Sequence, residues 1–224
     1  MDSIVKSEPF HIQAYKNIQR TLLEKEFSPG EQLTETSLAK KLGISRGPVR
    51  EAIRMLLHDG LLVQKGVHVY VFDPQLKDVL DLYLCKERLE PLGARLAASN
   101  IDEPGIKELN SIISKTESAL SNKSDNKEIA SLNTDFHSLI SKYSQNQQLI
   151  QFMNLIRAKN IYMRNVLLGD FTRKENFIDE HKNIADAIIN RNPDAAETLM
   201  KEHIKNDLDT WKIIFNDQEG DEKL

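Results

Sequence analysis

The sequence predicts a mainly α-helical chain in two parts: three helices with a β-hairpin, followed by an all-helical bundle of about six helices. Apolar residues recur at intervals of three and four positions through most of the 224 residues, which is the spacing of amphipathic helices. Alternation with a period of two is confined to "LLVQKGVHVYVFD", residues 61–73, and predicts two short strands. After Pro74 no strand pattern competes with the helical one. We therefore expect a first domain over residues 1–74, a second over 75–217 and a polar tail over 218–224.

The first domain contains three candidate helices with recognisable ends. Apolar residues at helical spacing begin at Ile12, and Pro29 in "SPGEQL" stops this first helix. Thr34 is positioned to cap a second helix, "ETSLAKKLG". Ser45 is positioned to cap a third, "RGPVREAIRMLLHDG", in which Pro48 falls in the first turn, where its missing N–H does no harm.

The second domain begins with the helical stretch "VLDLYLCKERLEPLGARLAASN" and continues with five more. Short polar, proline-containing or glycine-containing breaks separate them. The predicted spans of these five helices are 104–121, 125–143, 146–168, 173–191 and 193–216.

Composition excludes several classes of protein. The net charge of −4 argues against a strongly basic nucleic-acid binder, although residues 1–74 hold ten basic against nine acidic side chains and are the less acidic part. The single cysteine, Cys85, allows no intrachain disulfide, which fits a reducing compartment. No secretion signal and no apolar run long enough to span a membrane is present, so we expect a cytoplasmic protein without a membrane partner.

Two short helices joined by a tight turn and followed by a hairpin describe a winged helix-turn-helix. The third helix places Arg46, Arg50 and Arg54 four residues apart and therefore on one face, as a helix that enters the major groove of DNA requires. The hairpin turns near Lys65-Gly66, where a cation at the tip can reach a neighbouring groove or phosphate. The alternative is that the arginines form only a solvated face.

The stretch "LAKKLGISRGPVREAIRMLLHDGLL", residues 38–62, resembles the signature of the GntR family of bacterial transcription regulators. The match covers about 25 residues with the family's internal spacing. The resemblance implies contacts to bases, phosphates or the minor groove of operator DNA from Ser45, Arg46, Arg50, Lys65 and Gly66. It also implies a role for Glu35, at an acidic position common in the family, and for Thr36, where relatives often carry an arginine that contacts phosphate.

Three histidines of the second domain lie beside apolar helical stripes. Asn133 and His137 are four residues apart on one helix, so their side chains share a face, while His181 and His203 belong to two later helices. If these helices pack together, three imidazoles and an amide oxygen converge, and imidazole suits Zn²⁺, Ni²⁺ and other first-row metals. The alternative is a set of hydrogen-bonded core histidines, since no HExxH motif or Cys/His cluster is present.

The stretches "NTDFH", "EHKNIADAI" and "AAETLMKEH" resemble hallmarks of the FCD effector-binding domain in the FadR-like branch of the GntR family. The resemblance then covers nearly the whole chain, and it implies a divalent transition metal (Zn, Ni or Mn) bound by Asn133, His137, His181 and His203. Asparagine stands where aspartate is commoner, which leaves this ligand neutral. Lys86 aligns with an arginine that many relatives carry, and Arg88 is a possible replacement for binding an effector carboxylate.

These observations together predict a homodimeric, ligand-responsive transcription regulator that binds double-stranded operator DNA. We expect a repressor that is released by a small organic acid bound at the metal site. No nucleophile or general base is paired with the histidines in the sequence, so sensing is favoured over catalysis. Three alternatives remain: a regulator with structural histidines, one with an acyl-type ligand pocket, or a metal-dependent enzyme acting on an organic acid.

Overall fold

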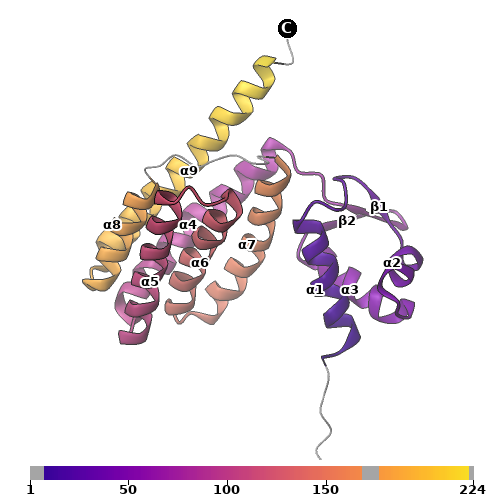
Figure 1. The fold of residues 1–224 in the computed structure, drawn as a ribbon, viewed down its shortest axis with the longest axis horizontal. Coiled ribbons are helices and arrows are strands. Elements are labelled where there is room, and N and C mark those ends of the chain that lie inside the picture. The colour runs from indigo at the N-terminus through magenta and orange to yellow at the C-terminus, as the bar shows by residue number, and fades with distance from the viewer. Residues whose placement is uncertain (1–7, 168–176, 222–224) are drawn as a thin grey trace, which may run out of the picture. The chain divides into compact units, whose positions relative to one another are not determined.

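The computed structural model describes residues 8–167 and 177–221, with side-chain environments up to residue 213 (Figure 1). The chain divides into two compact units. The first unit comprises residues 1–75 together with 158–169, and the second comprises residues 76–157 together with 170–224. Helix α7 (Gln147–Leu167) therefore begins in the second unit and ends in the first.

The first unit has the predicted three helices, and its helix ends follow the local sequence. The bounds are α1 (Phe10–Leu23), α2 (Glu35–Leu42) and α3 (Arg46–His58). The Thr34 side chain accepts a hydrogen bond of 3.2 Å from the backbone N–H of Ser37, so Thr34 is the cap of α2. Gly43 ends this helix with a φ of 67°, a left-handed conformation that glycine adopts without steric cost.

A small antiparallel sheet completes the winged helix-turn-helix. The predicted hairpin is formed by β2 (Leu62–Lys65) and β3 (His68–Val71), joined through Gly66, whose φ is 63°. A third strand, β1 (Gln32–Leu33), pairs with β3 and gives the order β1-β3-β2. The sequence did not predict β1, because two residues are too few to show an alternating pattern.

The core of the first unit includes a residue from far along the chain. Its apolar residues come from α1, α2, α3, the strands and the segments between them, and the fully buried Tyr162 of α7 belongs to the same cluster. The hydroxyl of Tyr162 donates a hydrogen bond of 2.6 Å to the carbonyl oxygen of Phe72, and the Asn165 amide donates one of 2.7 Å to the carbonyl oxygen of Leu23. The last ten residues of α7 thus help to close the core that α1 and α3 begin.

The second unit is the helical bundle that the sequence predicts. Besides the first half of α7, its helices are α4 (Leu76–Asn100), α5 (Glu103–Ser121), α6 (Asn126–Tyr143), α8 (Phe177–Ile189) and α9 (Pro193–Asp221). Helix α4 packs against α6, α8 and α9, and α5 packs against α6 and α8. The carboxylates of Asp102 and Asp125 accept backbone N–H hydrogen bonds and cap α5 and α6.

The predicted helix spans agree closely with these bounds, with differences at the ends. The predicted start of the fifth bundle helix at residue 173 lies outside the described residues. Helix α9 continues to Asp221, so residues 218–221 of the predicted polar tail are helical, and residues 222–224 lie outside the described residues. Among the residues that the structure describes, no helix combines the length and apolarity that crossing a membrane requires.

Candidate functional site

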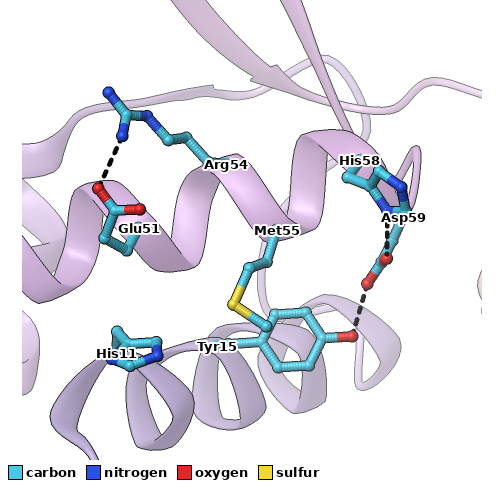
Figure 2. Close-up of a pocket in the computed structure, with 7 residues that line it drawn as sticks. All are labelled: His11, Tyr15, Glu51, Arg54, Met55, His58 and Asp59. Atoms are coloured by element: carbon cyan, nitrogen blue, oxygen red, sulfur yellow. Dashed lines mark hydrogen bonds and ion pairs between the residues drawn. The ribbon is translucent and has the colours of Figure 1, made fainter.

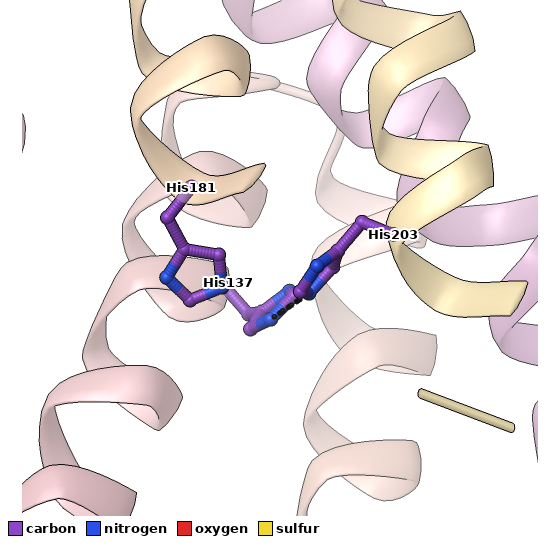
Figure 3. Close-up of side chains that lie close together, drawn as sticks. All are labelled: His137, His181 and His203. Atoms are coloured by element: carbon purple, nitrogen blue, oxygen red, sulfur yellow. Dashed lines mark hydrogen bonds between the residues drawn. The ribbon is translucent and has the colours of Figure 1, made fainter. Parts of the chain in front are cut away.

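Three helices of the second unit bring His137, His181 and His203 together (Figure 3). The histidines lie on α6, α8 and α9, and one ring nitrogen from each lies within 4.8 Å of the other two. The Nε2 atoms of His137 and His203 are 3.3 Å apart. Two nitrogens bound to one tetrahedral Zn²⁺, each at about 2.0–2.1 Å, are about 3.3–3.4 Å apart, so this spacing fits a shared ion.

Aromatic contacts hold the third imidazole in place. The ring of Phe136 stacks on that of His181 with centroids 3.9 Å apart and an interplanar angle of 14°. Phe177 meets the same imidazole edge-on, with centroids 5.3 Å apart. Because Phe136 is fully buried, these contacts restrict the plane of the His181 ring.

Two carboxylates bind the outer nitrogens of the facing histidines. The Glu90 Oε2 atom lies 2.5 Å from Nδ1 of His137, and the Glu180 Oε2 atom lies 2.6 Å from Nδ1 of His203. The contact at Nδ1 of His203 is a hydrogen bond, whereas Nδ1 of His137 lies close to Glu90 without hydrogen-bond geometry. A carboxylate hydrogen-bonded to Nδ1 favours the tautomer with its lone pair on Nε2, as in metal-binding histidines. The two nitrogens that face each other at 3.3 Å are therefore the ones suited to bind a cation.

A buried lysine accompanies the first of these carboxylates. Lys86 and Glu90 are almost fully buried on α4, with Nζ of the lysine 3.4 Å from Oε1 of the glutamate. Burial alone would raise the pKa of the Glu90 carboxyl, but its interactions with His137 and Lys86 outweigh burial and lower the pKa below its usual value. The carboxylate of Glu90 therefore stays ionised inside the bundle.

Of the other three residues predicted to bind the metal or the effector, Asn133 and Lys86 lie near the histidines and Arg88 does not. Asn133 lies on α6 one turn before His137 and is half-buried. Lys86 is adjacent to the histidine cluster through Glu90. Arg88 is exposed, and its guanidinium lies 3.8 Å from Glu87, away from these contacts.

Sequence reasoning did not identify Glu90 and Glu180 as parts of the site. Glu90 follows Lys86 by four residues on one helix, which is only a common ion-pair spacing. Glu180 directly precedes His181, yet its carboxylate binds His203 on the next helix. The contacts of Glu90 with His137 and of Glu180 with His203 depend on how the helices pack, and a local sequence pattern does not show this packing.

On the first unit, the Glu35 carboxylate contacts two of the three arginines of α3. Arg50 donates two hydrogen bonds to Glu35, from Nε at 2.7 Å and from a terminal nitrogen at 2.8 Å. Arg46 lies 3.9 Å from the same carboxylate, whereas Arg54 donates to Glu51 at 2.7 Å. The hydrogen bonds from Arg50 lower the pKa of Glu35, so the fork stays charged.

The other residues predicted to contact DNA are exposed. Ser45 occupies the N-cap position of α3, but its side chain makes no capping hydrogen bond. The exposed residues at the start of α2 and at the hairpin tip include Thr36, Lys65 and Gly66. All of them are accessible to a ligand approaching the first unit.

A pocket of about 570 Å³ lies between α1 and α3 of the first unit, and sequence reasoning did not predict it (Figure 2). The Tyr15 hydroxyl donates a hydrogen bond of 2.5 Å to Asp59 beside this pocket. Burial, together with the hydrogen bond and charge of Asp59, raises the pKa of Tyr15. The lining residues are His11, Tyr15, Glu51, Arg54, Met55, His58 and Asp59.

A winged helix-turn-helix bearing arginines on its third helix, in a chain with a second helical domain, defines a DNA-binding regulator of transcription. The comparison with protein families agrees with this class. The model for bacterial regulatory proteins of the gntR family matches residues 11–71, and the model for the FCD domain matches residues 81–206. The chain belongs to the GntR family of bacterial regulatory proteins and carries an FCD domain. It is a regulator of transcription and not an enzyme.

Similar proteins have the same class of function. The HTH-type transcriptional regulator YdhC of Bacillus subtilis is 31% identical over 97% of this chain and 96% of its own length. The HTH-type transcriptional repressor RspR of Escherichia coli is 25% identical over 89% of this chain and 87% of its own. The solved structure of E. coli McbR/YncC shares the fold, with a TM-score of 0.77 at 20% identity, covering 95% of this chain and all of that one.

Proposed function

We propose that this chain is a metal-dependent repressor that a small organic acid releases from operator DNA. In this proposal residues 1–74 bind double-stranded DNA, and residues 75–217 bind one divalent transition metal (Zn, Ni or Mn) and the acid. The protein acts as a homodimer in the cytoplasm, where each subunit binds one half-site of a near-palindromic operator.

The observation that carries the metal proposal is the pair of facing nitrogens on His137 and His203, 3.3 Å apart. Two lone pairs that face each other repel unless a proton or a cation lies between them. Glu90 and Glu180 hold both rings with Nε2 toward this point, and Phe136 holds His181 beside them. Such support of each ring is expected of a metal centre and is not needed by histidines that only fill space.

The acid would bind at the same centre. A bound metal with an open coordination position captures a carboxylate or hydroxyl oxygen of a small acid. Asn133 supplies a neutral oxygen, and Lys86 is the buried cation nearest to the histidines through Glu90. We therefore assign the acid's carboxylate to Lys86 and the metal. Arg88, exposed and beside Glu87, is the less favourable partner.

Operator binding is proposed for the surface of α2, α3 and the hairpin tip. Arg46 and Arg50 meet the major groove, Ser45 and Thr36 the phosphates, and Lys65-Gly66 the minor groove, while Glu35 holds Arg50. The acid releases DNA only if it binds more tightly to an arrangement of the subunits that does not fit the operator.

Metal content tests this proposal directly. The purified chain is dialysed exhaustively against chelator, supplied with Zn²⁺, Ni²⁺ or Mn²⁺, and compared with His181→Ala and with His58→Ala, which removes an exposed imidazole of the other unit. We expect about one ion per chain in the wild type and in His58→Ala, and a large loss in His181→Ala. Equal and negligible metal in all three would reject the proposal.

Sedimentation tests the proposed homodimer, and it should show a species of twice the 25.6 kDa of one chain.

A further inference from the structure

We infer that His68 is a further DNA contact of the first unit, which donates a hydrogen bond to a backbone phosphate and is positioned by Gln32. The inference rests on the proposed function, since it requires that the hairpin tip at Lys65-Gly66 meets the DNA duplex. His68 begins β3, and in the register of the hairpin it lies directly opposite Lys65 of β2. Both side chains are exposed.

The outer face of the small sheet carries these side chains. Successive residues of a strand point to opposite faces, and Val71 is fully buried in the core, so Tyr70 and His68 lie on alternate faces with Tyr70 turned away from the core. His68 is two residues before Tyr70 and therefore shares this outer face. Directly paired residues also share a face, which adds Lys65 from β2 and Gln32 from β1.

The imidazole of His68 is held in place although it is exposed. Nε2 of the Gln32 side chain lies 3.0 Å from Nδ1 of His68. Because an amide nitrogen only donates hydrogen bonds, Nδ1 accepts this one and the ring proton lies on Nε2. The ring of Tyr70 meets the imidazole edge-on, with centroids 6.4 Å apart. The imidazole therefore presents an N–H donor on the side away from Gln32.

The same face carries a cation without an acidic partner. Nζ of Lys65 lies 5.6 Å from the centre of the Tyr70 ring, which is a cation–π distance. Among the described residues, no carboxylate is in contact with Lys65 or His68. By contrast, Arg50 and Arg54 of α3 are each bound to a glutamate of the chain. A cation and a fixed N–H donor side by side fit an anion from outside the chain.

Duplex DNA is the partner that supplies such an anion at this place. The hairpin tip is assigned to the minor groove in the proposed function, and phosphates border that groove on both sides. Most hydrogen bonds between proteins and DNA go to phosphate or sugar, and they fix the register of the protein on the duplex. His68, directly behind the tip, would contact a phosphate beside the groove that Lys65-Gly66 enters.

Gln32 acts through His68 and is a positioning residue. A ring that is already held in one orientation loses little conformational freedom when it binds. Gln32 belongs to β1, the strand of two residues that pairs with β3. This short strand thus brings the amide that orients the imidazole on the neighbouring strand.

Fluorescence anisotropy of the full chain with two labelled duplexes, one A·T-rich and one G·C-rich, tests the inference. Low salt makes binding that is independent of sequence measurable. His68→Ala should bind both duplexes at least about fivefold more weakly and by the same factor, because a hydrogen bond to a charged phosphate is lost and carries no sequence information. His68→Gln should retain part of the affinity, since its amide nitrogen can replace Nε2 as the donor.

The control is His58→Ala, which removes another exposed imidazole of the first unit and should bind like the wild type. Gln32→Met removes the amide that holds the ring. It should weaken binding in the wild-type background but not in the His68→Ala background, because the two residues act as a unit. A purely structural role of Gln32 would weaken binding equally in both backgrounds.

The outcomes separate the inference from the proposed function. Wild-type affinity in His68→Ala, together with a loss in Arg50→Ala, would overturn the inference and leave the α3 contact intact. A loss in His68→Ala for only one of the two duplexes would also overturn it, since that result indicates a contact to bases. Failure of the wild-type chain to bind either duplex would overturn both. If His68→Ala does not fold, Gln32→Met decides, and wild-type affinity in that variant would reject the inference.

Discussion

The bidentate contact between Glu35 and Arg50 fixes the orientation of one side chain on the surface that we propose to bind DNA. Two hydrogen bonds to Glu35 fix the orientation of the planar Arg50 guanidinium in the absence of DNA. A planar donor with fixed orientation loses little conformational freedom when it meets a guanine edge or a phosphate. In the proposed function Glu35 acts on DNA through Arg50, which gives an acidic residue a role on a surface assigned to phosphate and base contacts.

We predict that Arg50→Ala and Arg46→Ala each weaken binding to operator DNA by about 1–3 kcal/mol. The physical reason is the loss of hydrogen bonds to base edges or phosphates from α3. Fluorescence anisotropy with operator and scrambled duplexes measures the change. Arg20→Ala, which removes an exposed arginine of α1 paired with Glu24, is the control and should bind like the wild type. Unchanged affinity in both α3 variants would exclude this face as the DNA contact.

At the scale of elements, the close approach of α5 and α6 depends on a glycine. A methyl group added at Gly105, in the first turn of α5, would lie 2.5 Å from Cζ of Tyr143 and 2.8 Å from Cγ1 of Ile101. Both neighbours are buried, so neither can move away into solvent. By contrast, a methyl group at Gly93 on α4 would meet Leu149 at an ordinary 3.6 Å.

We predict that Gly105→Ala destabilises the protein by about 1–3 kcal/mol through overpacking. Gly93→Ala is the matched control and should be neutral or stabilising by up to about 1 kcal/mol, because alanine favours the helix and meets no close contact. Urea denaturation followed by circular dichroism measures both. Equal stability of the two variants would show that α5 and α6 adjust freely at this point.

How far the sequence predicts the elements depends on whether the signal is local. Thr34 as a cap and Gly66 as the turn of the hairpin were predictable, because each role depends only on nearby backbone geometry. The convergence of His137 with His181 and His203 followed from apolar stripes and from the resemblance to a family. The contacts of Glu90 and Glu180 with the histidines were not predictable, since each is made to a side chain on another helix that only packing brings near.

At the scale of the whole molecule, the first unit is not contiguous in sequence. Tyr162 contributes to its core although 90 residues separate it from its hydrogen-bond partner, Phe72. Burial, with a smaller effect of the charge of Asp73, raises the pKa of Tyr162 to about 12. The neutral hydroxyl is thus favoured in the folded state more than in the unfolded chain, where tyrosine has a pKa of about 10.

We predict that Tyr162 contributes stability that is fully present below about pH 10 and is lost as the pH rises toward about 12. A raised pKa has this sign because the unfolded chain releases the proton first. Tyr162→Phe should lower the free energy of unfolding at neutral pH by about 1 kcal/mol, because the hydrogen bond to Phe72 is lost. Between about pH 10 and about pH 12 the free energy of unfolding of this variant should fall less than that of the wild type. Urea denaturation at several pH values measures the difference, with Tyr70→Phe as the control. Parallel pH profiles for wild type and Tyr162→Phe would contradict the prediction.

The membership of residues 158–167 in the first unit limits how this protein can be recombined. A fusion that takes residues 1–75 as a ready-made DNA-binding module would leave out Tyr162 and Asn165, and with them the groups that bind the carbonyl oxygens of Phe72 and Leu23. A chimaera that joins the first unit of one regulator to the helical domain of another brings in the end of α7 from the second protein. We expect such a chimaera to fold more readily when the residues at the end of that helix can make the same contacts with α1 of the first protein. A transferable DNA-binding domain of this chain therefore has to include the end of α7 as well as residues 1–75.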